Sequence, residues 1–180
     1  MFSLTVDDDI NLCLLEERQA EALFALVEEN RIYLREWLPW LDDTASPDSV
    51  NSFIKASLEQ FANHKGFQTG IVYRNQLAGV IGYHEINWAD RATSIGYWLA
   101  AGYQGQGIMT RACRFLVNYA FTELSLNRVE IRCAVKNRKS RAIPERLGFK
   151  TEGTLRQAEW LYDHFVELVV YGMLADEWRG

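Results

Sequence analysis

The sequence contains little cysteine and little proline. Cys13, Cys113 and Cys133 are odd in number and widely spaced, so they provide neither a disulfide framework nor a zinc-binding pattern. Proline occurs only at positions 39, 47 and 144, and no Pro-, Gly- or Ser-rich linker interrupts the 180 residues. These absences favour a single domain over residues 1–180, with no bound metal and with reduced thiols.

Basic clusters and long apolar runs are also missing. The 19 Lys and Arg residues are scattered among 24 Asp and Glu residues, and the net charge of −5 comes with no basic stripe for nucleic acid. No apolar run approaches the roughly 20 residues that span a bilayer. The opening segment MFSLTVDDDI lacks the basic and apolar regions of a signal peptide. We therefore expect a cytoplasmic protein with no nucleic-acid partner and no membrane association.

What is present is typical of a packed α/β domain with many aromatic side chains. Hydrophobic residues make up 48% and aromatic residues 13%, with six Trp, which favours a pocket or an interface beside the core. Apolar residues at helical spacing predict helices over 17–29, 31–41, 107–124 and 137–147, and one that begins at Ser46 and Pro47. Short apolar or alternating runs predict strands over 10–15, 67–73, 77–83, 92–99, 128–135, 149–153 and 164–174. The helix over 107–124 would be a crossover between two strands of a mixed sheet.

A glycine-containing turn lies between a predicted strand and a predicted helix, in the segment YQGQGIMT of residues 103–110. Gly105 and Gly107 let backbone N–H groups converge without interference from Cβ. The helix that follows presents unpaired N–H groups and the positive end of its dipole, which together favour a phosphate or pyrophosphate. A tight turn without a ligand has the same pattern.

Two nucleotide-binding patterns fail at this turn. Thr110 stands where the dinucleotide fingerprint needs a third glycine, and no Gly-Lys-Ser/Thr follows as a P-loop needs. A pyrophosphate site without either pattern leaves coenzyme A as a candidate ligand.

A second motif, NRKSRAIPERLGF over residues 137–149, lies at the next strand-to-helix junction. YQGQGIMT and N-x-x-S-x-x-x-x-E-x-x-G-F, about thirty residues apart, together resemble the GNAT superfamily of acetyltransferases. More narrowly they resemble its RimJ/RimL-like branch, which includes ribosomal-protein serine N-acetyltransferases. The strands IGYWL before the turn and LNRVEI after the helix are similar to the same branch, and the resemblance extends over residues 10–178.

The resemblance implies an α/β fold whose mixed, mostly antiparallel sheet of about seven strands has splayed central parallel strands and about four flanking helices. It also implies acetyl-CoA as cosubstrate and a homodimer. One position departs from the family pattern, since Gly102 stands where the superfamily has Gln or Arg. The phosphate contacts would therefore come mainly from backbone N–H groups.

By the same resemblance, coenzyme A lies in the gap beside the strand that ends at Leu99, with a free backbone N–H there as the donor to the thioester oxygen. Trp98 is alternatively a core residue, and Asn137 is alternatively only an N-cap. The residues expected to contact the cosubstrate are Trp98, Leu99, Gln104, Gly105, Gln106, Gly107, Ile108, Met109, Thr110, Asn137 and Ser140.

Acetyl transfer to an amine needs a base for the ammonium and a proton donor for the leaving sulfur. The resemblance assigns these roles to Glu159 and Ser140, whose alternatives are an exposed loop carboxylate and a solvated helical serine. A carboxylate beside aromatic residues such as Trp160 would have a raised pKa. Glu85 is the second candidate for the base, because it lies at the end of a predicted strand facing the acceptor.

The aromatic segment around Trp37, Pro39 and Trp40 corresponds to the acceptor side of the family. It is too apolar to be only solvated surface, so it forms a pocket wall, a dimer contact or part of the core. The candidate substrate contacts are Trp37, Trp40 and Glu85.

Three functions are compatible with these residues. The first is an N-acetyltransferase for the α-amino group of a protein, such as a ribosomal protein. The second is an acetyltransferase for a small amine, such as a polyamine, an antibiotic or an aminoacyl nucleotide, because a fold does not determine the acceptor. The third is a non-catalytic acyl-CoA sensor, which would bind coenzyme A without turnover.

Overall fold

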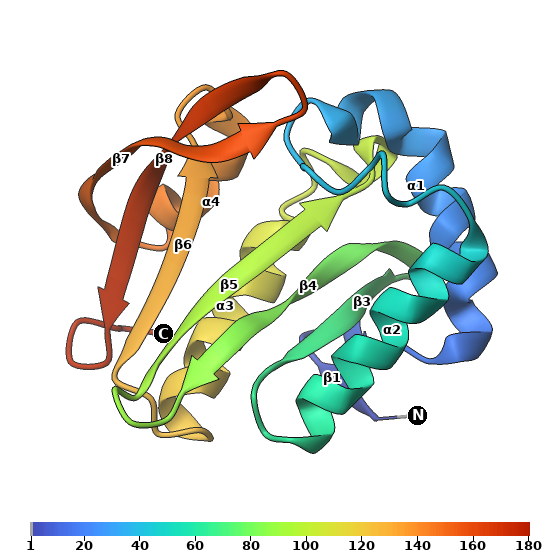
Figure 1. Ribbon diagram of the computed structural model, residues 1–180. Coiled ribbons are helices and arrows are strands. Elements are labelled where there is room, and N and C mark those ends of the chain that lie inside the picture. Colours follow the sequence, from blue (N-terminus) through green and yellow to red (C-terminus); the bar gives the residue numbers. More distant parts are fainter. Residues whose placement is uncertain (1) are drawn as a thin grey trace.

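The computed structural model describes residues 2–180, which form one sheet with helices on both faces (Figure 1). The strands are β1 (Ser3–Thr5), β2 (Ile10–Leu14), β3 (Phe67–Tyr73), β4 (Gln76–Asn87), β5 (Ala92–Leu99), β6 (Arg128–Ala134), β7 (Lys150–Leu161) and β8 (His164–Leu174). The α-helices are α1 (Ala20–Arg35), α2 (Pro47–Ala62), α3 (Ile108–Thr122) and α4 (Arg138–Arg146), with two 3-10 turns, η1 (Glu17–Gln19) and η2 (Ala101–Tyr103).

The sheet is mixed and mostly antiparallel, as predicted, and has eight strands in the order β1-β2-β3-β4-β5-β6-β8-β7. Its single parallel pair, β5 and β6, is joined through the crossover helix α3. Only residues 92–94 of β5 pair with residues 128–130 of β6, and beyond them the two strands diverge (Figure 1). The predicted splay at the end of β5 is therefore present, and it opens the middle of the sheet.

The helices cover the two faces of the sheet separately. In Figure 1, α2 crosses in front of β3, whereas α3 lies behind β4 and β5. Side chains alternate along β4, so Val80 packs with Ile54 of α2 while the next residue, Ile81, packs in the cluster of Leu116 of α3. Burial on both faces explains why the central strands have continuous apolar runs rather than strict alternation.

Several predicted elements have different bounds in the structure. The helices predicted over 17–29 and 31–41 are one continuous helix, α1, which follows the 3-10 turn η1. It ends at Arg35, because Pro39 lacks an N–H and its ring disfavours helical backbone at Leu38. The strand predicted over 77–83 extends to Asn87. The strand predicted over 149–153 extends to Leu161. β7 is an edge strand with residues 150–158 exposed, so the alternation that identifies a half-buried strand is missing from its sequence.

Within residues 2–180, no helix combines the length and the apolarity that a bilayer crossing demands. The same residues contain no group of three or more His, Cys, Asp or Glu side chains arranged to hold a metal ion. All three cysteines are buried free thiols.

Candidate active site

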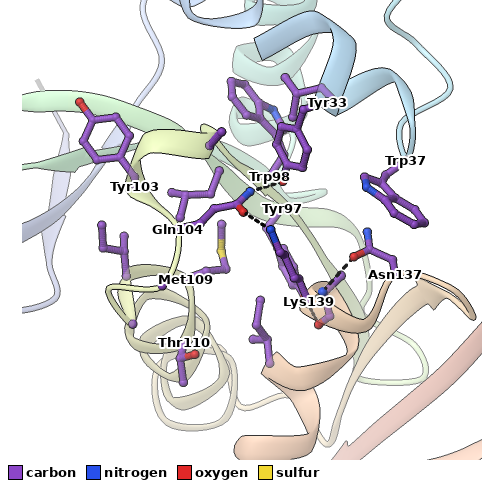
Figure 2. Close-up of a pocket in the computed structure, with 18 of the residues that line it drawn as sticks. Tyr33, Trp37, Tyr97, Trp98, Tyr103, Gln104, Met109, Thr110, Asn137 and Lys139 are labelled. Atoms are coloured by element: carbon purple, nitrogen blue, oxygen red, sulfur yellow. Dashed lines mark hydrogen bonds between the residues drawn. The ribbon is translucent and has the colours of Figure 1, made fainter.

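A cavity of about 850 Å³ occupies the place where β5 and β6 diverge (Figure 2). Its walls come from α1 and the segment after it, from the end of β5, from the glycine turn and the start of α3, and from the start of α4. The lining residues are Tyr33, Leu34, Trp37, Leu38, Tyr97, Trp98, Leu99, Ala101, Tyr103, Gln104, Gly105, Gly107, Ile108, Met109, Thr110, Arg111, Asn137, Lys139, Ser140, Ile143 and Arg146.

The end of β5 presents a free backbone edge to this cavity. The N–H of Ala100 donates to the carbonyl of Ala78 at 2.8 Å, on the β4 side. Backbone groups of successive residues in a strand point to opposite edges, so the N–H of Leu99 points toward the edge that β6 has left. This N–H can donate to a ligand oxygen in the gap.

The glycine turn closes one end of the cavity. Gly105 and Gly107 have φ values of 75° and 72°, a left-handed conformation that side chains with a Cβ rarely adopt. A Cβ on either glycine would meet no atom within 4 Å, so both face open space. Gly107 is the N-cap of α3, and the N–H groups of the first turn of that helix point to the same place. The turn therefore has the geometry of an anion site.

Helix α4 forms the opposite wall and begins at Asn137. The Asn137 Oδ1 accepts the backbone N–H of Ser140 at 3.1 Å, so Asn137 is an N-cap that also lines the cavity. Both roles predicted for this residue are thus compatible.

The hydroxyl of Ser140 lies between a tyrosine and a cysteine. It donates toward Cys133 Sγ at 3.2 Å and toward the Tyr97 hydroxyl at 3.4 Å. Tyr97 itself donates to the backbone carbonyl of Ser140 at 3.0 Å. Burial raises the pKa values of Tyr97 and Cys133, so both are neutral near pH 7. Ser140 is therefore a cavity residue with a defined set of contacts, not a solvated helical serine.

A polar chain that the sequence did not predict crosses the cavity. The Gln104 amide donates to the Tyr33 hydroxyl, and Lys139 Nζ donates to Gln104 Oε1 at 3.0 Å (Figure 2). Tyr33 comes from α1 and Lys139 from α4, so the link depends on packing between distant segments.

Two further cationic side chains line the cavity near the glycine turn. Arg146 Nη1 lies 3.5 Å from the hydroxyl of Thr110, and Arg111 forms an ion pair with Asp7 at 2.7 Å. Lys139, Arg146 and Arg111 were missed because the family motif does not specify their positions. Their charge and their proximity to a suspected anion site were the available signals.

The segment between α1 and α2 covers the other end of the cavity. Trp37 lines the cavity, whereas Trp40 packs against Trp98 with ring centroids 6.3 Å apart. Tyr162, in the β7–β8 turn, anchors this segment: its hydroxyl donates to the Leu38 carbonyl and accepts the Leu41 N–H at 3.2 Å. Trp37 is thus a cavity wall, and Trp40 supports Trp98.

Glu159 lies on β7, not on a loop. Residues 155 and 159 pair with residues 168 and 166 of β8, so β7 contains extra residues in a bulge just before Glu159, and Gln157 in this bulge has a φ of 48°. Bulges of this kind redirect side chains near functional sites. Glu159 does not line the cavity itself, although its strand ends beside the segment that does (Figure 1).

Burial raises the pKa of Glu159, in the direction the sequence predicted. The expected cause was the neighbouring Trp160. Adjacent residues of a strand point to opposite faces, however, and Trp160 is 53% exposed. The burial of Glu159 therefore comes from its own face of the strand, where Leu161 is also buried.

Glu85 is exposed on β4 and does not line the cavity. Its neighbour His84 contacts Ser94 Oγ through Nδ1 at 3.2 Å, and burial, followed by the charge of Arg132, lowers the pKa of His84.

Gln106 is the one residue of the expected cosubstrate site outside the cavity lining, because its amide donates to the Gly102 carbonyl at 3.2 Å.

Comparison with known proteins gives relatives over the whole chain. Residues 9–150 match the family model described as an acetyltransferase (GNAT) domain. A Bacillus subtilis (strain 168) protein, YdaF, whose name describes a ribosomal N-acetyltransferase, is 40% identical over 100% of this chain and 99% of its own.

Two solved structures show the same fold over nearly the full length. RimL, a ribosomal L7/L12 α-N-protein acetyltransferase in complex with coenzyme A, is 27% identical with a TM-score of 0.94, covering 98% of this chain and 99% of its own. The microcin C7 self-immunity acetyltransferase MccE, in complex with acetyl-CoA and AMP, is 32% identical with a TM-score of 0.90, covering 94% of each chain.

Proposed function

Because the chain belongs to the GNAT acetyltransferase family, we propose that it transfers the acetyl group of acetyl-CoA to the α-amino group at a protein N-terminus, such as that of a ribosomal protein. The activity itself, N-acetyl transfer with acetyl-CoA as cosubstrate, follows from the family. The observation that supports the proposed acceptor most is the full-length similarity to RimL, whose name specifies α-N-protein acetylation.

The groups that line the cavity support acetyl-CoA as its ligand. The glycine turn and the start of α3 supply N–H donors for the pyrophosphate, and Lys139 and Arg146 add positive charge nearby. The free edge of β5 beyond Ser94 can pair with the amide groups of the pantetheine arm. These backbone donors would make the phosphate contacts that Gly102, which has no side chain, cannot make.

Three groups of this chain would carry the chemistry. The Leu99 N–H would donate to the thioester oxygen, where negative charge develops. Glu159, as a carboxylate, would take a proton from the acceptor ammonium, directly or through a water molecule. Ser140 would give its hydroxyl proton to the sulfur that leaves. Glu159 then returns its proton to solvent. The attacking nitrogen loses a second proton as the amide forms, and this proton replaces, through solvent, the one that Ser140 has given. Each turnover therefore removes two protons from the ammonium, of which one ends on the thiol and one in solvent.

A small acceptor is the alternative, and one observation favours it. MccE, which is 32% identical, was solved with AMP beside acetyl-CoA. The aromatic side chains of Tyr33, Trp37 and Trp98 at the cavity could stack on a flat ring as well as contact a peptide.

A screen of acceptors tests the proposal. Peptides with N-terminal Ser or Ala, spermidine and an aminoacyl adenylate analogue would each be mixed with acetyl-CoA, and release of free thiol measured. Turnover with the peptides alone supports the proposed acceptor. Turnover only with spermidine or the adenylate would overturn it, and binding of coenzyme A without turnover on any amine would favour the sensor.

The homodimer and the cytoplasmic location stay predictions.

Gly107→Trp is expected to abolish measurable binding of coenzyme A. The new side chain would project into the open space before α3, and the φ of 72° would strain any residue with a Cβ. Isothermal titration with coenzyme A measures the effect. Gly153→Trp is the control, since Gly153 also faces open space but lies on β7 outside the cavity lining. Unchanged affinity in Gly107→Trp would remove the turn from the binding site.

A further inference from the structure

We propose that Tyr97 is a positioning residue for Ser140, and that Pro144 makes this possible by leaving the Ser140 carbonyl without a helical donor. The inference rests on the proposed role of Ser140 as proton donor. It concerns how the fold holds that serine in place.

The first step of the argument is the sequence of α4. In an α-helix the carbonyl of residue 140 accepts the N–H of residue 144. Residue 144 is proline, inside the helix, and it has no N–H to donate. The Ser140 carbonyl is therefore free to accept a bond from outside the helix.

Tyr97 supplies that bond from β5. Its hydroxyl donates to the Ser140 carbonyl at 3.0 Å. The backbone N–H of Ser140 donates to the side-chain oxygen of Asn137 at 3.1 Å. Both backbone polar groups of Ser140 are thus bound by side chains, one from the N-cap and one from the strand that lines the cosubstrate cavity.

The direction of the Tyr97 bond determines what the serine hydroxyl can do. A phenol has one proton, and here it is used on the Ser140 carbonyl, so the phenol oxygen can only accept from the Ser140 hydroxyl 3.4 Å away. Burial raises the pKa of Tyr97, which keeps this proton in place over the working pH range. The serine proton therefore rests on weak acceptors, Tyr97 and Cys133, and is available to a stronger one in the cavity.

Tyr97 also links β5 to α4. Its backbone belongs to the strand that carries the Leu99 N–H, and its side chain binds the helix that carries Ser140. One contact thus fixes the separation between the oxygen-binding edge and the proton donor.

A double-mutant cycle tests the inference, with wild type, Tyr97→Phe, Ser140→Ala and the double variant. Acetyl transfer to a peptide with N-terminal Ser is followed by thiol release. Tyr97→Phe is expected to lower kcat by about 10-fold and to leave the KM for acetyl-CoA within about 2-fold. In the double variant Tyr97→Phe should add less than about 2-fold to the loss from Ser140→Ala, because its effect passes through Ser140.

Pro144→Ala is the second test. It restores an N–H at position 144, which competes with Tyr97 for the Ser140 carbonyl, and should lower kcat by about 3-fold on the same reasoning. Tyr73→Phe is the control for loss of a phenol, since Tyr73 lies on β3 outside the cavity lining, and it should keep wild-type kcat.

The outcomes separate the two proposals. Wild-type kcat in Tyr97→Phe, or losses that multiply in the double variant, would overturn the role of Tyr97, and wild-type kcat in Pro144→Ala would overturn the role of the proline. Wild-type kcat in Ser140→Ala would instead overturn the proposed function of the serine. If the wild type does not acetylate the peptide, the proposed acceptor is wrong. The cycle is then measured on the slow hydrolysis of acetyl-CoA, in which the same sulfur leaves.

Discussion

Glu159→Gln is expected to lower kcat for acetyl transfer by about 10²-fold or more, the usual contribution of a general base. The amide keeps the shape of the side chain but cannot accept the proton of the acceptor ammonium. Thiol release with saturating acetyl-CoA and a peptide bearing N-terminal Ser measures the effect. The affinity for coenzyme A should be unchanged, because Glu159 does not line the cavity.

The pH dependence of the acetyl-transfer rate is a second test of Glu159 as the base. Burial raises the pKa of Glu159, so the carboxylate that acts as base is lost as the pH falls through a value above the usual 4.5. The rate of the wild type should therefore decline on the acid side at a higher pH than an ordinary glutamate would give, and this limb should be absent in Glu159→Gln.

A loss of folding stability should not explain the lower kcat of Glu159→Gln. A raised pKa means that the ionised carboxylate is disfavoured in the folded state, so ionisation costs stability above the usual pKa. At pH 7 Glu159→Gln removes that cost, and its melting temperature should be equal to or slightly above that of the wild type.

Two carboxylates serve as comparisons for Glu159. Glu152 lies on the same strand but binds Arg128 at 2.5 Å, which holds the pKa of Glu152 below its usual range, and Glu152→Gln should keep wild-type kcat. Glu85→Gln tests the second candidate base. A large loss in Glu85→Gln together with wild-type rates in Glu159→Gln would transfer the role to Glu85.

Ser140→Ala is the other large expected effect, a loss in kcat of about 10²-fold, because the leaving sulfur would have no placed proton donor. The Asn137 cap bonds the backbone N–H of residue 140, which alanine retains, so α4 should still begin at the same place. Single-turnover thiol release measures the chemical step apart from product release.

The binding of coenzyme A distinguishes a chemical role of Ser140 from a packing role. Ser140→Ala should bind coenzyme A with nearly wild-type affinity, whereas a packing defect in the cavity would weaken binding as well. Ser52→Ala, an exposed serine on α2, is the control for loss of a hydroxyl. Rates in Ser140→Ala equal to those of the wild type would contradict the assignment.

The sequence predicted the features that depend on a short stretch of chain. The left-handed backbone at Gly105 and Gly107 follows from the glycines themselves, and the N-cap at Asn137 follows from its own side chain, three residues before Ser140. The splay of β5 from β6 came from the resemblance, which those same local motifs carry. The mixed sheet and the crossover helix were likewise predicted correctly, since they follow from the order of strands and helices.

Only the tertiary structure determined the contacts between distant segments. The bulge that places Glu159 is a matter of register between β7 and β8, and an exposed edge strand carries no alternation that would reveal it. Tyr97 reaches Ser140 across 43 positions of sequence, because folding brings the end of β5 next to the start of α4. Pro144 could be read in the sequence as a missing donor, but which side chain replaces that donor is decided by how the sheet and α4 pack together.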